Sequence, residues 1–213
     1  MKYQYGWAYP DVDEFMASQL KEDGSYQGSH LAMALSFVKD FSLAIDAGAH
    51  VGTWARPMSL LFAQVIAVEP SPDTFACLQE NLRQFGVQNV ELKNVALGAH
   101  AGLVSMELNQ RETERLNTGA RYTVQGGEIP RETIDSWQVP SLGFLKLDVE
   151  GSEPYVLEGA IKTLKRCRPI VLFEDKGLWK RFELPRNAPH VILTKLGYRH
   201  LARASCDEIW GHA

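Results

Sequence analysis

Short apolar runs alternate with amphipathic segments along most of the chain. The runs are rich in aliphatic residues, and several of them end in a carboxylate. Strands that alternate with helical segments usually pair in parallel through helical crossovers, so this pattern predicts an α/β fold with a mostly parallel sheet. The expected strands are Ser42–Asp46, Val65–Glu69, Val90–Leu97, Phe144–Val149, Ile170–Glu174, Tyr198–Ala202 and Glu208–Gly211.

Two segments between these strands carry clear helix signals. The first begins with Ser71 as a cap and Pro72 in the first helical position, and Gly86 suits its end. Its apolar residues recur at helical spacing, which buries one face against a sheet. The second begins at Ser152 and leads to the strand near Pro169. We expect helices of this kind on both faces of the sheet.

The N-terminal part of the chain shows helical rather than strand periodicity. Asp11–Leu20 and Leu31–Asp40 both have an apolar and a polar side, so residues 1–40 are predicted to form a helical extension. Further along, Leu103–Leu108 is expected to be a short strand. The polar segment Asn109–Gly127 has no clear period and is interpreted as a mobile loop.

Length and composition fit one domain over residues 1–213, with a Rossmann-like core at 41–213. A chain of 213 residues buries roughly 70% of its unfolded surface, enough for one sizeable core. The net charge of -4 is spread along the chain, which indicates neither a nucleic-acid nor a membrane partner. Three separate cysteines and the absence of an apolar leader or membrane span favour a cytoplasmic protein. The oligomeric state stays open.

The first expected strand ends in a turn suited to ligand binding. In Ile45-Asp-Ala-Gly-Ala-His-Val-Gly52, small residues let a ligand approach the backbone where the next helix begins. Glu69 closes the following strand, 21 residues after Gly48, where a carboxylate can accept hydrogen bonds from ribose hydroxyls. The glycines alone are explained equally well by a tight turn. Together with Glu69 they favour a nucleoside-binding crevice.

The same turn discriminates between two nucleoside cofactors. The dinucleotide motif Gly-x-Gly-x-x-Gly is absent, because His50 stands where a glycine would make room for a pyrophosphate. Asp46 adds a carboxylate that disfavours phosphates but suits the ammonium group of S-adenosylmethionine. S-adenosylmethionine is therefore the preferred cofactor, and an NAD-linked oxidoreductase is the alternative.

At this point the sequence resembles the FkbM-type S-adenosylmethionine-dependent methyltransferases, within the class I superfamily. The likeness covers about 135 of the 213 residues, from Phe41 to Asp175, and its most specific part is Phe144-Leu-Lys-Leu-Asp-Val-Glu-Gly-Ser-Glu153. The resemblance implies a seven-stranded Rossmann-like sheet with a reversed last hairpin. It also implies O-methylation of a hydroxyl on a sugar or polyketide-like acceptor.

The resemblance further assigns cofactor contacts by position. They are Asp46, Gly48, His50 and Gly52 at the methionine end, Glu69 at the ribose, Asn94 and Val95 beside the adenine, and Asp148 beside the transferring methyl group. The histidine at position 50 departs from the asparagine that is usual in the family.

Acidic residues gather where the fourth strand meets its helix. Strand alternation puts Asp148 and Glu150 on one side, facing the crevice, whereas Glu153 falls in the first helical turn and is interpreted as a capping residue. With Glu174 and Asp175 after the next strand, these carboxylates could hold a divalent cation, although the preferred interpretation includes no metal.

Methyl transfer to an alcohol needs a group that removes the hydroxyl proton. The Tyr26-Gln-Gly-Ser loop favours His30 among the histidines, but the sequence does not select one base. The candidates are Asp148, Glu150, and one of His30, His50, His190 or His200.

The sequence thus predicts an S-adenosylmethionine-dependent methyltransferase that acts on a sugar or another small natural product. Motifs of zinc hydrolases, serine esterases and phosphate-loop enzymes are missing. Besides the oxidoreductase, a non-catalytic nucleoside-binding module remains an alternative. Such a module would have no solvent-open cavity beside the methyl position.

Overall fold

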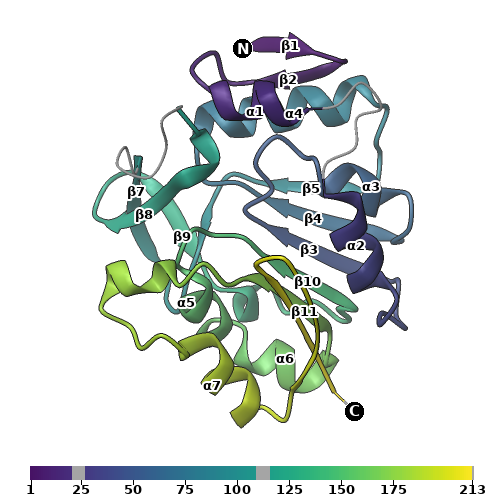
Figure 1. The fold of residues 1–213 in the computed structure, drawn as a ribbon, viewed down its shortest axis with the longest axis vertical. Coiled ribbons are helices and arrows are strands. Elements are labelled where there is room, and N and C mark those ends of the chain that lie inside the picture. The colour runs from purple at the N-terminus through teal and green to yellow at the C-terminus, as the bar shows by residue number, and fades with distance from the viewer. Residues whose placement is uncertain (21–26, 109–115, 213) are drawn as a thin grey trace.

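A seven-stranded sheet forms the centre of the molecule (Figure 1). The computed structural model describes residues 1–20, 27–108 and 116–212. Across the sheet the strands follow the order β12 (Arg199–Ala204), β13 (Asp207–Gly211), β11 (Ile170–Glu174), β10 (Phe144–Leu147), β3 (Leu43–Ala47), β4 (Gln64–Val68) and β5 (Val90–Lys93). The last five run parallel, whereas β13 is antiparallel to both of its neighbours. The prediction of an α/β fold with a mostly parallel sheet is confirmed.

Helices cover both faces of this sheet (Figure 1). Helices α5 (Glu153–Glu158), α6 (Ile161–Cys167) and α7 (Ala188–Lys195) share one core with the strands, and α2 (Gly28–Leu35), α3 (Ala55–Ser59) and α4 (Pro72–Gln84) pack on the other side. Alternation along the strands produces the two cores: Ile45 packs into the first, and its neighbour Ala44 into the second.

The helices begin near the predicted residues, but their caps differ in detail. Pro72 occupies the first turn of α4 after an extended Ser71, yet the Ser71 hydroxyl makes no capping hydrogen bond. The helix predicted after Ser152 is divided into α5 and α6 at Gly159. There the backbone of Gly98 comes so close that an added Cβ on Gly159 would lie 2.1 Å from the Gly98 carbonyl oxygen.

A smaller sheet of four strands adjoins the central one. Its order is β6 (Ala96–Leu97), β9 (Ile129–Glu132), β7 (Gly102–Leu108) and β8 (Arg121–Gln125). The strand predicted over residues 90–97 therefore breaks into β5 and β6. The break contains Asn94, whose side-chain amide donates hydrogen bonds to the carbonyls of Glu69 and Pro70.

The loop predicted over residues 109–127 is wrong for its second half. This half contains the 3-10 turn η1 (Thr118–Ala120) and strand β8. Because β8 is an edge strand without a fully buried side chain, its sequence lacks the alternation that marks half-buried strands. Residues 109–115 lie outside the described part of the chain.

The N-terminal extension is only partly helical, which corrects the prediction. It opens with an antiparallel hairpin of β1 (Lys2–Gln4) and β2 (Trp7–Tyr9), and α1 (Glu14–Gln19) follows. The hairpin packs on α4. The side-chain amide of Asn81 accepts a hydrogen bond from the N–H of Ala8 and donates one to the Ala8 carbonyl, and the ring of Trp7 lies against Phe85. The pairing depends on contacts with a helix 70 residues away, so local periodicity does not signal it.

Two further 3-10 turns complete the fold, η2 (Ile134–Trp137) and η3 (Leu178–Phe182). Across the described ranges, no helix has both the length and the apolar character needed to cross a bilayer.

Candidate active site

A cavity of about 470 Å³ opens at the carboxyl ends of the parallel strands. The turns after β3 and β10 and the ends of β4 and β11 line it, together with the smaller sheet and N-terminal residues. Ligands of open α/β sheets bind at this edge. The predicted site residues that line the cavity are Gly48, His50, Glu69, Val95, Asp148, Glu150 and His30.

The turn after β3 requires glycine at position 48. Gly48 has a φ of +78°, and an added Cβ would lie 1.8 Å from the carbonyl oxygen of Asp148. The N–H groups of Gly48 and Ala49 donate to the Val68 carbonyl at 3.0 and 2.9 Å, so they are engaged with the protein rather than offered to a ligand. The turn therefore supplies a close backbone surface rather than a set of unpaired donors.

Three of the residues predicted to contact a cofactor lie behind the cavity wall. Gly52 gives room to Leu78 of α4, whose Cδ1 would be 2.8 Å from an added Cβ. The side-chain amide of Asn94 donates hydrogen bonds to the backbone carbonyls that follow β4. The carboxylate of Asp46 is fully buried and pairs with the Lys146 ammonium at 2.9 Å. These three residues support the lining and do not form it.

Lys146 is a residue of the site that the sequence analysis did not assign. Its ammonium group donates to Asp46 and to the Gly48 carbonyl at 3.0 Å, and lies 3.7 Å from the Asp148 carboxylate. Burial alone would lower the pKa of Lys146, but the two aspartates raise it, so the side chain stays charged. A single lysine in an apolar strand, two positions before an aspartate, was the available signal.

Glu69 is held in place by the backbone. One carboxylate oxygen accepts the N–H of His50 at 3.0 Å, and the other accepts the N–H of Ser71 at 2.9 Å. Burial raises the pKa of Glu69, which His50 and the two backbone donors oppose. A carboxylate has about four acceptor positions, so two hydroxyl groups of a ribose can still bind.

A buried aspartate of the N-terminal extension lies behind His50 and Thr118 of the cavity lining. Asp13 accepts hydrogen bonds from the hydroxyl and the N–H of Thr118 and lies 3.4 Å from His50 Nε2. Burial would raise the pKa of Asp13, but His50 and the N–H of Met16 lower it. An ionised Asp13 thus joins α1, η1 and the turn after β3 around the cavity.

Three carboxylates converge where β10 and β11 end. Asp148, Glu150 and Glu174 each place a carboxylate oxygen within 4.8 Å of the other two. Burial, followed by the charge of Asp148, raises the pKa of Glu150 to about 8 and that of Glu174 to about 7. Lys176 pairs with Glu174 at 2.8 Å. The predicted meeting of these acidic side chains is found, with Glu174 in the group and Asp175 outside it.

Glu153 belongs to the turn rather than to the cavity lining. One of its oxygens accepts the N–H groups of Val149 and Gly151 at 3.1 and 3.2 Å. Burial raises the pKa of Glu153 to about 7. The side chain fixes the turn that presents Asp148 and Glu150.

Three of the four histidines named as candidate bases, His30, His50 and His200, occupy different environments. His30 lines the cavity, and its Nδ1 lies 2.7 Å from the carboxylate of Asp207, which lines the cavity as well. The ring of His50 is bonded to Thr118. His200 is exposed on the edge strand β12. Asp207 lies in the last hairpin, 177 residues from His30, so sequence spacing could not connect the two.

The sequence profile described as the Methyltransferase FkbM domain matches residues 46–200, well over half of the chain. The chain belongs to the FkbM methyltransferase family. This confirms the resemblance found in the sequence.

Curated relatives of this FkbM-family chain are methyltransferases. Hexuronic acid methyltransferase AglP of Haloferax volcanii is 31% identical over 138 residues, which cover 62% of this chain and 56% of the relative. Methyltransferase 1 of Beauveria bassiana is 26% identical over 146 residues, covering 56% and 59%. The matches thus span little more than half of each relative.

Solved structures agree with the family at the level of the fold. The FkbM methyltransferase of Methylobacillus flagellatus aligns with 100% of this chain and 48% of its own, at a TM-score of 0.55 and 16% identity. The precorrin-6y C5,15-methyltransferase of Geobacter metallireducens aligns over 98% of both chains, at 0.50 and 14%.

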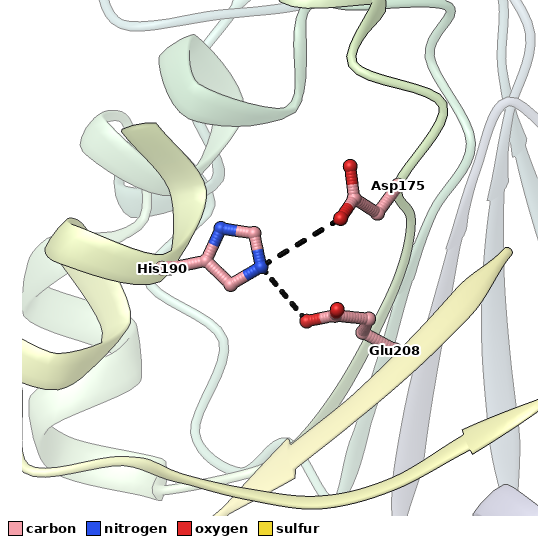
Figure 2. Close-up of side chains that lie close together, drawn as sticks. All are labelled: Asp175, His190 and Glu208. Carbon is pink, nitrogen blue, oxygen red and sulfur yellow. Dashed lines mark hydrogen bonds and ion pairs between the residues drawn. The ribbon is translucent and has the colours of Figure 1, made fainter. Parts of the chain in front are cut away.

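The FkbM-family chain also carries a second group of ionisable side chains, formed by Asp175, His190 and Glu208 (Figure 2). His190 Nε2 lies 2.9 Å from Glu208 and 3.8 Å from Asp175. Glu208 also accepts hydrogen bonds from the Trp210 ring N–H at 3.0 Å and from Arg203 at 3.3 Å. Because these donors satisfy Glu208, the group joins α7 to the last hairpin and serves a structural purpose.

Proposed function

We propose that this chain transfers the methyl group of S-adenosylmethionine to a hydroxyl oxygen of a carbohydrate or another small natural product. The observation that carries the proposal is the meeting of the Gly48 turn and the Glu69 carboxylate in one cavity. A tight glycine turn beside a buried carboxylate suits a nucleoside without phosphates. Membership of the FkbM methyltransferase family supports the same cofactor.

In this proposal the cofactor residues divide into lining and positioning groups. Glu69 binds the ribose hydroxyls, Gly48 and His50 pass beside the methionine part, and Val95 flanks the adenine. Asp148 lies beside the transferring methyl group. The positioning residues are Asp46, Gly52 and Asn94, which hold the lining from behind.

The reaction is a displacement at carbon. The acceptor oxygen forms a bond to the methyl carbon while the carbon–sulfur bond breaks, leaving neutral S-adenosylhomocysteine. Since the sulfonium charge disappears, placing the two reactants in line supplies most of the acceleration. The hydroxyl proton must pass to a base, and that transfer adds a further gain in rate.

Among the candidate bases, His30 fits best. Burial and the charge of Asp148 raise the pKa of Glu150, which disfavours the ionised form that a base needs. The carboxylate of Asp148 lies 3.7 Å from the Lys146 ammonium, which competes with a hydroxyl group for it. His30 has Nδ1 bonded to Asp207, which leaves Nε2 to take the proton, in the arrangement by which carboxylates orient catalytic imidazoles.

The acceptor class rests on a relative and on the lining. A hexuronic acid methyltransferase is similar over part of the chain, which supports a sugar acceptor. The acidic lining suits hydroxyl donors and disfavours the phosphates of nucleic acids. The three cysteines, all unpaired, fit a cytoplasmic location, which we include in the proposal.

The rival functions receive less support. An NAD-linked oxidoreductase has to place a pyrophosphate at the turn after β3, where His50 takes the position of a glycine. A binding module without catalysis does not need a cavity that brings an oriented histidine and several carboxylates together.

Transfer of radiolabelled methyl from S-adenosylmethionine to panels of neutral sugars, uronic acids and polyketide alcohols tests this proposal. We expect an alkali-stable ether product with at least one hydroxyl acceptor, and a rate that falls when His30 is replaced. Labelling of amines or of nucleic acid alone would contradict the proposed acceptor class.

A further inference from the structure

The carboxylates of Asp148, Glu150 and Glu174 form a cluster without enough cationic partners. Lys176 pairs with Glu174 at 2.8 Å, and Lys146 lies 3.7 Å from Asp148 while it bonds Asp46 more closely. Within the described ranges, no protein group donates a hydrogen bond to the Glu150 carboxylate or forms an ion pair with it, although the residue lines the cavity and is only 7% exposed. A buried carboxylate without a donor is costly, so this side chain points to a ligand that supplies positive charge.

We propose that Asp148, Glu150 and Glu174 bind a divalent cation that holds the methyl acceptor. All three offer oxygen, the donor that Mg²⁺, Mn²⁺ and Ca²⁺ prefer, whereas zinc and copper favour nitrogen or sulfur. Their oxygens lie within 4.8 Å of one another. Oxygen ligands that share one cation at about 2.4 Å lie no more than about 4.8 Å apart, so these three oxygens are close enough to share a Ca²⁺ ion.

The cluster faces the side of the cavity where the proposed base lies, and the inference rests on the proposed function. Glu174 of β11 and Asp207 of β13 are opposite residues in the antiparallel pair, and Asp207 holds His30. Three protein oxygens leave coordination positions open toward the cavity. Two neighbouring hydroxyls of a sugar can fill them, and a bound cation lowers the pKa of such a hydroxyl. The inferred acceptor class is therefore one with vicinal hydroxyls.

A protonated amine of the acceptor could also neutralise these carboxylates. The cluster favours the metal, because its three carboxylates bring ligand oxygens within 4.8 Å of one another from two strand ends, as oxygen ligands do around Ca²⁺. Binding of an amine acceptor in place of a metal ion is therefore one outcome that the experiment distinguishes.

The second group, Asp175, His190 and Glu208, provides a matched control. It also brings three ligand atoms within 4.8 Å, yet Glu208 already receives hydrogen bonds from His190, Trp210 and Arg203 (Figure 2). A cation there would have to displace these donors. Its variants therefore report whether any loss of binding is specific to the cavity.

The test is a titration of the purified chain with Mn²⁺, followed by electron paramagnetic resonance of the free ion. It is run with and without S-adenosylhomocysteine, on wild type, Glu150→Gln and Asp175→Asn. We expect one saturable site in wild type and in Asp175→Asn, displaced by Mg²⁺ or Ca²⁺. Glu150→Gln should bind Mn²⁺ at least about tenfold more weakly.

Absence of a saturable site in wild type up to millimolar Mn²⁺ would overturn the proposal, and so would equal binding by wild type and Glu150→Gln. Binding of an amine acceptor in place of Mn²⁺ would overturn it as well. Titration of the same samples with S-adenosylhomocysteine separates the two claims: cofactor binding without metal binding ends the cation proposal alone, whereas loss of both ends the proposed function.

Discussion

The two clusters of ionisable side chains meet at the end of β11, where Glu174 of one precedes Asp175 of the other. Glu174 and Asp207 line the cavity, whereas their chain neighbours Asp175 and Glu208 are outside its lining and point toward His190 (Figure 2). Strand alternation alone sends adjacent carboxylates to opposite sides. Each side also has its histidine, which is His30 in the cavity and His190 behind it.

The difference between the clusters lies in their hydrogen bonds. Behind the cavity, Glu208 accepts hydrogen bonds from three side chains. In the cavity, Glu150 accepts none from the described residues and its pKa rises to about 8. Because Glu150 faces the cavity, a bound ligand can supply the partner that the protein does not provide there. The two clusters therefore differ in the hydrogen-bond donors that reach their carboxylates.

The largest effect should come from replacing the two histidines, one at a time. His30→Gln should lower kcat about a hundredfold to ten-thousandfold, because it removes the proposed base. His190→Gln should keep kcat but lower the unfolding free energy by about 1–3 kcal/mol, because it breaks the bond to buried Glu208. Methyl-transfer kinetics and thermal denaturation of both variants measure this. Equal losses of kcat would contradict the comparison.

The second prediction separates the cofactor end of the cavity from the acidic cluster. Glu69→Ala should weaken S-adenosylhomocysteine binding by roughly 1–3 kcal/mol, since it removes charge-assisted hydrogen bonds to the ribose. Glu150→Gln should leave this affinity within a factor of about two. Calorimetric titration gives both values, and Glu91→Ala, which changes an exposed strand residue, is the control. An unchanged affinity in Glu69→Ala would remove Glu69 from the cofactor site.

A smaller effect concerns stability and pH. The pKa of Glu150 is about 8 in the folded chain, against an ordinary value of 4.5, so the folded state binds more protons between these values. Its contribution is complete below pH 4.5 and is lost as the pH rises through 8. Without divalent cations, wild type should therefore lose at least about 1 kcal/mol of stability between pH 5 and 8 relative to Glu150→Gln.

Urea denaturation in the presence of a chelator measures this difference, with Asp175→Asn as the control that should follow wild type. Parallel pH profiles of wild type and Glu150→Gln would show that the Glu150 carboxyl is solvated normally.

The smallest expected change lies at the rim of the structural cluster. Arg203 bonds Glu208 at 3.3 Å, but its side chain is half exposed. Arg203→Ala should lower the unfolding free energy by no more than about 1 kcal/mol and should not alter methyl transfer. A larger loss, measured by the same denaturation, would contradict the small contribution expected of this half-exposed pair.

The sequence was most informative where local chemistry and position coincide. The apolar strands, the turn at Gly48 and the carboxylate at Glu69 are each visible within a few residues, and the structure brings the last two into one cavity. The family resemblance predicted the reversed last hairpin, and the antiparallel pairing of β13 with β11 agrees with it.

Features that depend on distant partners could not be predicted. Asp46 was predicted to contact the cofactor. In the structure its carboxylate forms an ion pair with Lys146, which lies 100 residues away on the neighbouring strand. The pairing of His30 with Asp207 joins an N-terminal helix to the last hairpin. Strand β8 has too little burial to show a period. In each case the deciding contact is tertiary, and local patterns carry no signal for it.

The central claim is that the cavity beside Gly48 and Glu69 binds a sulfonium nucleoside. Isothermal titration of the chain with S-adenosylhomocysteine, with NADH in a parallel titration, tests it most directly. The account predicts saturable binding of one S-adenosylhomocysteine per chain and no heat of binding with NADH. Saturable binding of NADH with no response to S-adenosylhomocysteine would contradict it.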